Sequence, residues 1–261
     1  AYEIPKRDWS SDVCSSDLFP FVGRLKEDTY LYEGQLFNCG QHGFARDCTF
    51  NMVASDIHTC TFELVSDEST YKKFPFHFSL QTIYTLKDNI LFIKHIIKNK
   101  SLTLMPFSIG AHPAFICPFE SEESFEDYFL EFEKPETLKS FVLNNGLIEE
   151  SQFDVLANEN IITLNYETFK KIDTYIFQNI KSDWVELKSS KSKWVVRVSL
   201  KGFPYLGIWT KPDAPYLCIE PWFGLADFKN HDGNIFNKKG IEVLSQNKSF
   251  ECTYSITVSE L

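Results

Sequence analysis

Four short segments of the sequence each place an ionisable side chain beside glycine, proline or aromatic residues, where strands end and clefts open. In chain order these side chains are Arg24, His42, His112 and Glu220. Histidine exchanges protons near neutral pH, and a partly buried glutamate is a stronger base than a free one. The residues are therefore candidates for acid–base chemistry if the fold brings them together. The segments that contain them are residues 19–24, 40–47, 109–115 and 218–224.

Each segment by itself also fits a structural role. A histidine beside glycine is commonly a hydrogen-bonded structural residue, and a glutamate before proline commonly ends a strand. Arg46 and Asp47, which follow His42, also fit a structural ion pair. Taken singly, the residues therefore leave a catalytic and a structural interpretation open.

The elements that would position these residues have the pattern of short strands. Apolar residues alternate along residues 74–84, which is the period of a strand with one buried face. A turn at residues 87–89 leads into an apolar run at residues 90–97, so these segments predict a hairpin. The same alternation predicts strands at residues 194–200 and 250–258.

Further short apolar runs also predict strands, and the sequence predicts little helix. Runs at residues 60–65, 205–209 and 217–220 predict additional strands. Helix is expected only locally, in the acidic stretch 120–127, and residues 231–234 have the composition of a loop. This combination is typical of a β-sandwich or barrel, so we expect an all-β fold.

Composition favours one large domain and excludes several classes of partner. A chain of 261 residues that is 43% hydrophobic and 16% aromatic can bury an extended core. The formal net charge of −10 repels nucleic-acid phosphates and anionic membranes. The sequence has no apolar stretch of transmembrane length and no basic-then-apolar leader. We expect a cytoplasmic protein that binds neither nucleic acid nor membrane.

The seven cysteines are scattered, without a CxxC pair or a histidine at metal-ligand spacing along the chain. We expect reduced, mostly buried thiols and no metal site, in preference to structural zinc. Cys218, beside Ile219, has the setting of a core residue, because free cysteine behaves as a small hydrophobe. The remaining four histidines are expected on the surface or in strands, at His58, His77, His95 and His231.

The N-terminal residues require a separate interpretation. Residues 8–18 resemble the translation of a DNA-sequencing adapter, and we interpret them as an artefact of sequence assembly. Their Ser/Asp-rich composition alone also fits a polar loop. We expect residues 1–18 to be a truncated or artefactual segment, and residues 19–261 to form a single domain that lacks its first strands.

As a set, and in this order, the motifs resemble those of the aldose 1-epimerase (galactose mutarotase) superfamily, especially its branch of shorter bacterial mutarotase-like proteins. The resemblance covers residues 19–261 and implies a large antiparallel β-sandwich, the galactose mutarotase-like supersandwich, with its site in a groove across one face. Where the branch has two glycines before its second histidine, this chain has Gly110 and Ala111. We expect the extra methyl group to crowd the pocket only slightly. The motifs closest to the branch are residues 19–24, 40–47, 106–115 and 219–227.

The resemblance also implies roles for individual residues. His112 becomes the general acid, Glu220 the general base, and His42 and Arg24 partners for sugar oxygens. Opening a cyclic hemiacetal needs a proton delivered to the ring oxygen while another leaves the anomeric hydroxyl, and reclosure reverses both transfers. One acid and one base suffice, so no metal or other cofactor is expected.

Three further residues are candidates for the site, and two of them, Asp173 and Trp209, have a second interpretation. Asp173 falls near the position of a superfamily aspartate that holds sugar hydroxyls, but it also fits a strand-entry residue that bonds backbone amides. Trp222 offers an apolar face to a sugar ring. Trp209 fits the pocket wall, although a core tryptophan is the simpler interpretation.

The sequence therefore predicts an isomerase that interconverts the anomers of a hexose or hexose phosphate, with a small sugar as its partner. A phosphorylated substrate would call for clustered basic residues, for which Arg24 and Arg46 are candidates. The alternative is a catalytically silent carbohydrate-binding or sensor protein on the same fold. A hydrolase or lyase would need a second acidic motif as distinctive as that of Glu220. The sequence gives no prediction of oligomeric state.

Overall fold

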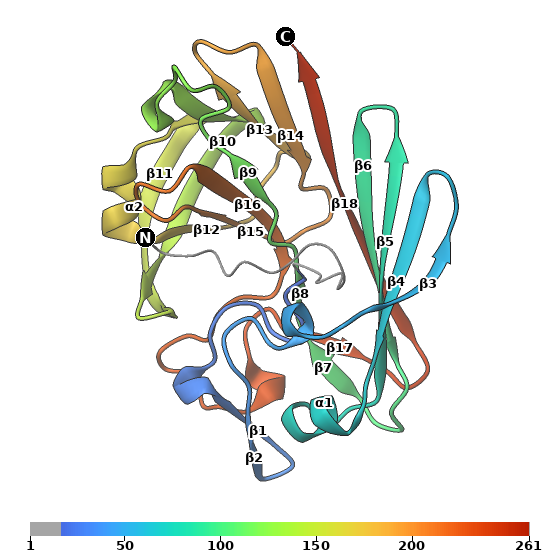
Figure 1. The fold of residues 1–261 in the computed structure, drawn as a ribbon. Coiled ribbons are helices and arrows are strands. Elements are labelled where there is room, and N and C mark those ends of the chain that lie inside the picture. Colours follow the sequence, from blue (N-terminus) through green and yellow to red (C-terminus); the bar gives the residue numbers. More distant parts are fainter. Residues whose placement is uncertain (1–16, 261) are drawn as a thin grey trace.

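The computed structural model describes residues 17–260, and its strands form two main antiparallel sheets (Figure 1). The larger sheet has nine strands. In the order in which they lie side by side, they are β11 (Leu147–Thr163), β10 (Tyr128–Asn144), β13 (Trp184–Ser189), β14 (Trp194–Ser199), β18 (Ser249–Glu260), β6 (Ile90–Asn99), β5 (Phe78–Lys87), β4 (Thr59–Val65) and β3 (Asn51–Ser55).

The smaller sheet lies against the β10–β11 end of the larger one, where β12 contacts β10 (Figure 1). Its strands are β12 (Thr174–Gln178), β15 (Tyr205–Trp209), β16 (Tyr216–Phe223) and β8 (Ile109–Gly110), with β9 (Ala114–Ile116) also paired to β16. Two ribbons complete the strands: β1 (Thr29–Tyr32) with β2 (Gln35–Asn38), and β7 (Met105–Phe107) with β17 (Glu242–Leu244).

Helix is sparse in the described range. The α-helices are α1 (Glu68–Lys73) and α2 (Tyr166–Ile172), and the short 3-10 helices are Lys26–Asp28, Ala45–Asp47, Phe125–Asp127 and Ile235–Asn237. No helix in residues 17–260 is long and apolar enough to cross a membrane. The expectation of an all-β antiparallel fold is confirmed.

Phenylalanine rings fill the core on which this architecture depends. Phe74, Phe76 and Phe78 are completely buried, as the alternation predicts. The ring of Phe19 lies 4.9 Å from that of Phe78, so the segment that leads to Arg24 is anchored in the core. Aromatic side chains bury large apolar areas, and they therefore fix this segment firmly.

Most predicted strands are present, but the start of the first one is wrong. The alternation begins at Phe74, but strand β5 begins at Phe78. The short helix α1 ends at Lys73, and residues 74–77 connect the two elements. Asp67 caps that helix by accepting from the backbone N–H of Thr70, while its own N–H donates to the Thr70 hydroxyl. Six residues are too few to give a helical period, so the helix was not predictable from periodicity.

The expectation of helix at residues 120–127 is also wrong, apart from one 3-10 turn at Phe125–Asp127. Helix α2 and the 17-residue strands β10 and β11 were not predicted from the sequence. Register shifts interrupt the pairing of these strands in several places, and such bulges break the alternation on which a strand prediction depends. Their turn is regular: Asn145 and Gly146 both have positive φ, 54° and 78°, as a two-residue type I′ hairpin requires.

The structure describes two residues of the N-terminal segment. Leu18 forms a bridge with Gly110, and the hydroxyl group of Thr82 donates to the carboxylate of Asp17 at 2.5 Å. Residues 1–16 lie outside the described range. The interpretation of residues 8–18 as an artefact therefore stays a prediction.

Candidate active site

Strand β16 brings three different functional groups to one face of the smaller sheet. Alternate residues of a strand point the same way, so Cys218, Glu220 and Trp222 share a face. Glu220 is only 3% exposed. Nε1 of Trp222 donates to its Oε2 at 3.2 Å, so the neighbouring indole holds one carboxyl oxygen in place.

Two glycines make room for the ring of Trp222. Gly207 of β15 pairs with Glu220, and a Cβ atom there would come within 2.2 Å of the indole. Gly110 of β8 pairs with Trp222, and its Cβ would come within 2.6 Å of Cδ1. These positions therefore require glycine. Ala111, where the superfamily branch has a second glycine, is buried in the core.

His112 lies opposite Glu220 because both strands beside it pair with β16. Gly110 pairs with Trp222 and Ala114 with Cys218, which places the intervening His112 level with Glu220. Nδ1 of His112 lies 3.3 Å from Oε1 of Glu220. The acid and base implied by the resemblance are therefore in direct contact.

Burial shifts the pKa values of this pair in opposite directions. It raises the pKa of Glu220 well above its usual value, against a smaller opposing effect of the Trp222 hydrogen bond. It lowers the pKa of His112 to about 4. Both shifts have the same cause, because burial disfavours the charged form of each side chain.

His42 is fixed as a neutral donor. Its backbone has a positive φ of 67°, and the Gly23 N–H donates to its Nδ1 at 3.1 Å. Burial, with a further effect of His112, lowers its pKa to about 3. Because Nδ1 accepts, the proton of the neutral ring is on Nε2. This nitrogen lies 3.1 Å from Nε2 of Gln41, which is also a donor, so the two atoms do not form a hydrogen bond in this tautomer. The His42 and His112 rings lie 5.8 Å apart.

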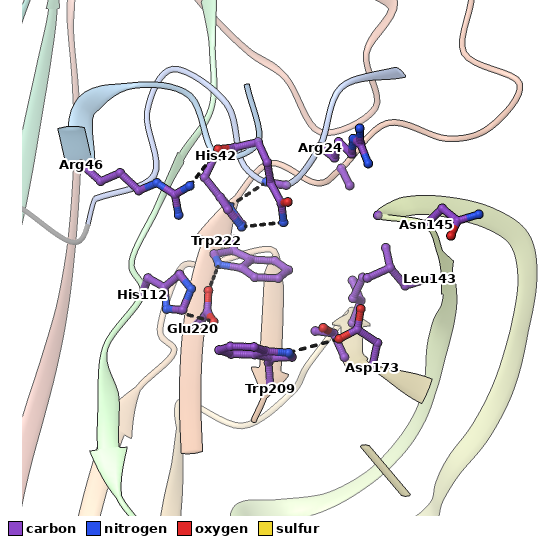
Figure 2. Close-up of a pocket in the computed structure, with 16 residues that line it drawn as sticks. Arg24, His42, Arg46, His112, Leu143, Asn145, Asp173, Trp209, Glu220 and Trp222 are labelled. Atoms are coloured by element: carbon purple, nitrogen blue, oxygen red, sulfur yellow. Dashed lines mark hydrogen bonds and ion pairs between the residues drawn. The ribbon is translucent and has the colours of Figure 1, made fainter. Parts of the chain in front are cut away.

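Asp173 and Trp209 form the opposite part of the site. Asp173 follows α2 with a φ of 65° and accepts a hydrogen bond from Nε1 of Trp209 at 3.1 Å. The Trp209 ring stands at 89° to that of His112, with 6.1 Å between the ring centroids. Trp209 thus lines the site, and its indole holds one oxygen of the Asp173 carboxylate. In the view of Figure 2, the Glu220 carboxyl group lies between the rings of Trp209 and Trp222.

The two arginines of the site have partners within the protein. Nε and Nη2 of Arg24 donate to the two carboxylate oxygens of Asp28 at 3.0 and 2.9 Å. Nη2 of Arg46 donates to the backbone oxygen of Gln41 at 3.3 Å, and its Nε lies 4.0 Å from the Asp47 carboxylate. The ion pair considered for Arg46 and Asp47 is therefore present, but it is long.

All six residues to which the sequence analysis gave a role line one cavity of about 400 Å³. They are Arg24, His42, His112, Asp173, Glu220 and Trp222. Part of the wall comes from the tip of the β10–β11 hairpin, including Leu143 and Asn145, and was not predicted from the sequence (Figure 2). The Asn-Gly pair at residues 145–146 was the available signal for that hairpin.

The site also holds a group with the spacing of metal ligands. Donor atoms of His112, Cys218 and Glu220 all lie within 4.8 Å of one another, which no other set of three or more such residues achieves in the described part of the chain. Cys218 is buried, as expected of a core residue. Spacing along the sequence did not reveal His112 as its neighbour, because the two meet across paired strands.

Comparison with known proteins is consistent with this geometry. The model of the aldose 1-epimerase family matches residues 13–256. The chain belongs to this family. The chromosomal LacX protein of Lactococcus lactis subsp. lactis is 33% identical over 232 residues, which span 85% of this chain and 77% of LacX.

Solved structures of aldose 1-epimerase relatives have the same fold. A galactose mutarotase related enzyme from Lactobacillus acidophilus has a TM-score of 0.89 and 33% identity, over 94% of this chain and 82% of that one. A galactose mutarotase-like protein from Lactobacillus casei has a TM-score of 0.87 and 28% identity, over 93% and 84% of the two chains. The expected galactose mutarotase-like fold is therefore confirmed.

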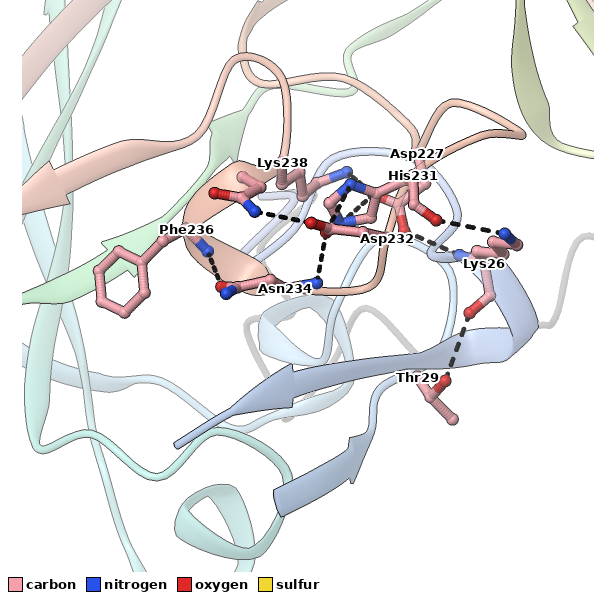
Figure 3. A network of polar contacts seen from close by, with 9 residues as sticks. Lys26, Thr29, Asp227, His231, Asp232, Asn234, Phe236 and Lys238 are labelled. Carbon is pink, nitrogen blue, oxygen red and sulfur yellow. Dashed lines mark hydrogen bonds and ion pairs between the residues drawn. The ribbon is translucent and has the colours of Figure 1, made fainter. Parts of the chain in front are cut away.

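In this aldose 1-epimerase family member, Asp227 connects its own segment to those of Arg24 and Ile148, and Figure 3 shows its polar contacts with Lys26 and Lys238. Its backbone N–H donates to the oxygen of Arg24 at 2.8 Å, and its own oxygen accepts from Ile148 at 2.9 Å. Its carboxylate accepts from the backbone of Lys26 at 2.9 Å and from Nζ of Lys238 at 2.7 Å. Asp227 and Lys238 are almost fully buried. The ion pair therefore holds the rim of the cavity together.

We predict that Lys238→Met destabilises the protein strongly, because it leaves the Asp227 carboxylate buried without its partner. The free energy of unfolding should fall by about 3–5 kcal/mol, measured by chemical denaturation. The matched control is Lys170→Met, which removes an exposed ion pair with Glu167 and should change stability little. Equal stability of Lys238→Met and the parent protein would contradict this role.

Proposed function

We propose that the protein is a mutarotase, which interconverts the α and β anomers of a free hexose by opening and reclosing the sugar ring. The observation that carries the proposal is the 3.3 Å contact between His112 and the buried Glu220, in the wall of a cavity of about 400 Å³. Two groups that exchange protons lie side by side in a pocket large enough for a small ligand. Membership of the aldose 1-epimerase family, and relatives described as galactose mutarotase-like, support the same reaction.

The His112–Glu220 pair needs only the one proton that it holds. In the ring-opening step, His112 in its protonated form gives a proton to the ring oxygen O5 as the C1–O5 bond breaks. Glu220, as carboxylate, takes the proton of the O1 hydroxyl, and a C1 carbonyl forms. The pair then carries its proton on Glu220. After rotation about C1–C2, the O5 hydroxyl attacks C1, His112 takes its proton, and Glu220 returns a proton to O1.

The direct contact between His112 and Glu220 allows a proton to pass from one to the other before the sugar ring opens. Desolvation favours the neutral arrangement, in which Glu220 holds the proton. Sugar hydroxyl groups that enter the cavity supply hydrogen bonds to the charged arrangement, so the proton can pass to His112 across the contact. The pair therefore needs neither net uptake nor net release of a proton during turnover.

Other wall residues fit the binding of a polyhydroxylated ring. His42 lines the cavity, and Nε2 of its neutral ring carries a proton that it can donate to a sugar oxygen. Asp173 keeps lone pairs on its carboxylate beyond the single bond from Trp209 and can accept from hydroxyl groups. The indole rings of Trp209 and Trp222 provide apolar faces for the C–H groups of a sugar.

The charges of the wall favour a free hexose over a hexose phosphate. A phosphate group is best bound by guanidinium groups in bidentate geometry. The Arg24 guanidinium already makes that contact with Asp28, and Arg46 is bonded to Gln41. Asp173 adds a carboxylate to the wall. A phosphate would therefore have to displace existing partners.

We predict that Glu220→Gln and His112→Asn each lower kcat by about 10²–10⁴, because each removes one partner of the proton transfer. The measurement is the rate at which fresh α-galactose and α-glucose approach anomeric equilibrium, by polarimetry. His58→Asn, at an exposed position outside the cavity, is the control and should retain the parent rate. Sugar binding by folded parent protein without acceleration would instead favour a silent carbohydrate-binding protein.

The pH dependence of kcat/KM should show an acid limb well below pH 6.5. The lowered pKa of His112 means that the pair gains a second proton only as the pH falls through about 4. The raised pKa of Glu220 means that the pair loses its proton only well above pH 4.5. The rate should be highest between these limits. An acid limb centred on the pKa of a free histidine would contradict the proposed shared proton.

The same measurement distinguishes the substrates. We predict a higher kcat/KM for glucose than for glucose 6-phosphate, with the difference enlarged at low ionic strength. Asp28→Asn, which frees the Arg24 guanidinium from an ion pair, should shift the preference toward the phosphate. A parent protein that prefers glucose 6-phosphate would refute the proposed restriction to free hexoses while leaving the mutarotase reaction intact.

A further inference from the structure

We propose that His112, Cys218 and Glu220 form a binding site for a zinc-like divalent cation, and that a cation bound there blocks the acid–base pair. The site itself is independent of the proposed function, and only its inhibitory effect rests on it. The proposal depends on the three donor atoms that lie within 4.8 Å of one another.

Sheet geometry brings these donors together. Cys218 and Glu220 are alternate residues of β16 and point to the same face. Cys218 pairs with Ala114, two residues after His112, so the imidazole approaches both side chains from the short connection between β8 and β9. The neighbours of His112 hold this connection to β16, because the N–H of Ala111 donates to the oxygen of Pro221 at 3.1 Å and the oxygen of Pro113 accepts from Ile219 at 3.4 Å.

The donor set and its spacing suit zinc. One sulfur, one nitrogen and one oxygen are ligand types that Zn²⁺ combines in proteins. Nδ1 of His112 and Oε1 of Glu220 are 3.3 Å apart. Nitrogen and oxygen ligands on a tetrahedral zinc lie about 3.4 Å apart, given metal–ligand bonds of about 2.1 Å. The existing contact is therefore close to the spacing required.

The surroundings support a bound cation and explain its effect. Nε1 of Trp222 bonds the other oxygen of Glu220, which orients the carboxylate as an outer hydrogen bond commonly does at metal sites. His112 and Glu220 line the cavity, so a cation from solution can reach their donor atoms through it. A cation on these atoms would occupy the lone pairs that the mutarotase reaction requires.

The direct test uses Co²⁺ as a spectroscopic probe at about pH 8, where proton competition for the thiol and carboxyl groups is reduced. The full chain should bind one Co²⁺ with a thiolate-to-cobalt charge-transfer band in the near ultraviolet, and Zn²⁺ should abolish the band. Cys218→Ser should lose the band. The matched control, Cys252→Ser, alters another buried thiol and should keep it. No band in folded parent protein, or a band that persists in Cys218→Ser, would overturn the site.

X-ray absorption of the zinc-loaded parent protein gives a test that does not depend on the folding of a variant. One sulfur at about 2.3 Å, with nitrogen and oxygen ligands near 2.0–2.1 Å, is expected. A shell of nitrogen and oxygen alone would refute the proposal.

Inhibition is measured as the mutarotation rate with and without Zn²⁺, normalised to the metal-free rate of each variant. Zn²⁺ should inhibit the parent reversibly, and Cys218→Ser should need roughly tenfold more metal or greater. A cobalt band in protein without mutarotase activity would support the site and contradict the proposed function. Mutarotase activity in protein that shows no cobalt band would support the proposed function and contradict the metal site.

Discussion

The burial of the Glu220 carboxyl group is the constraint on which the rest of the site depends. An ionised carboxylate is costly to bury without partners, so the group must be protonated or matched. The protein provides one partner for each oxygen, the Trp222 indole and the His112 imidazole. Strand β16 positions both partners. Trp222 lies two residues after Glu220 on the same face of the strand, and His112 lies between β8 and β9, which both pair with β16. The contact between Glu220 and His112 is a consequence of this backbone register.

Some features of the fold that lower its stability keep the site accessible to a ligand. Gly207 and Gly110 lie in paired strands, and because they have no side chains they leave room for the Trp222 ring. Asp227 and Lys238 form a buried ion pair, which is weak evidence for stability because desolvation opposes it. Its contacts to the backbone of Lys26, and through the Asp227 backbone to Arg24 and Ile148, suggest that its value lies in holding three distant segments at one rim.

Sequence patterns predicted those elements whose geometry repeats regularly. Strands β5, β14 and β18 were predictable from uninterrupted alternation, and β4, β6, β15 and β16 from short apolar runs. Strands β10 and β11 were not, because bulges shift their register, and α1 and α2 are shorter than a useful helical window. The candidate site residues emerged from short motifs, and the structure gathers them around one cavity. The hairpin tip at Asn145 was missed, because its approach to the segment of Arg24 depends on how two remote parts of the chain pack.

The residues that were hardest to interpret from sequence share a physical property. Cys218 and Trp209 have the pattern of core residues, and Cys218 is indeed buried. Burial, however, is also what raises the pKa of Glu220 and lowers that of His112. A strand that turns one face toward the cavity must carry its functional groups at positions with the period of core residues. Periodicity therefore detects the strand but cannot separate its chemistry from its packing, and only the partner across the sheet makes that distinction.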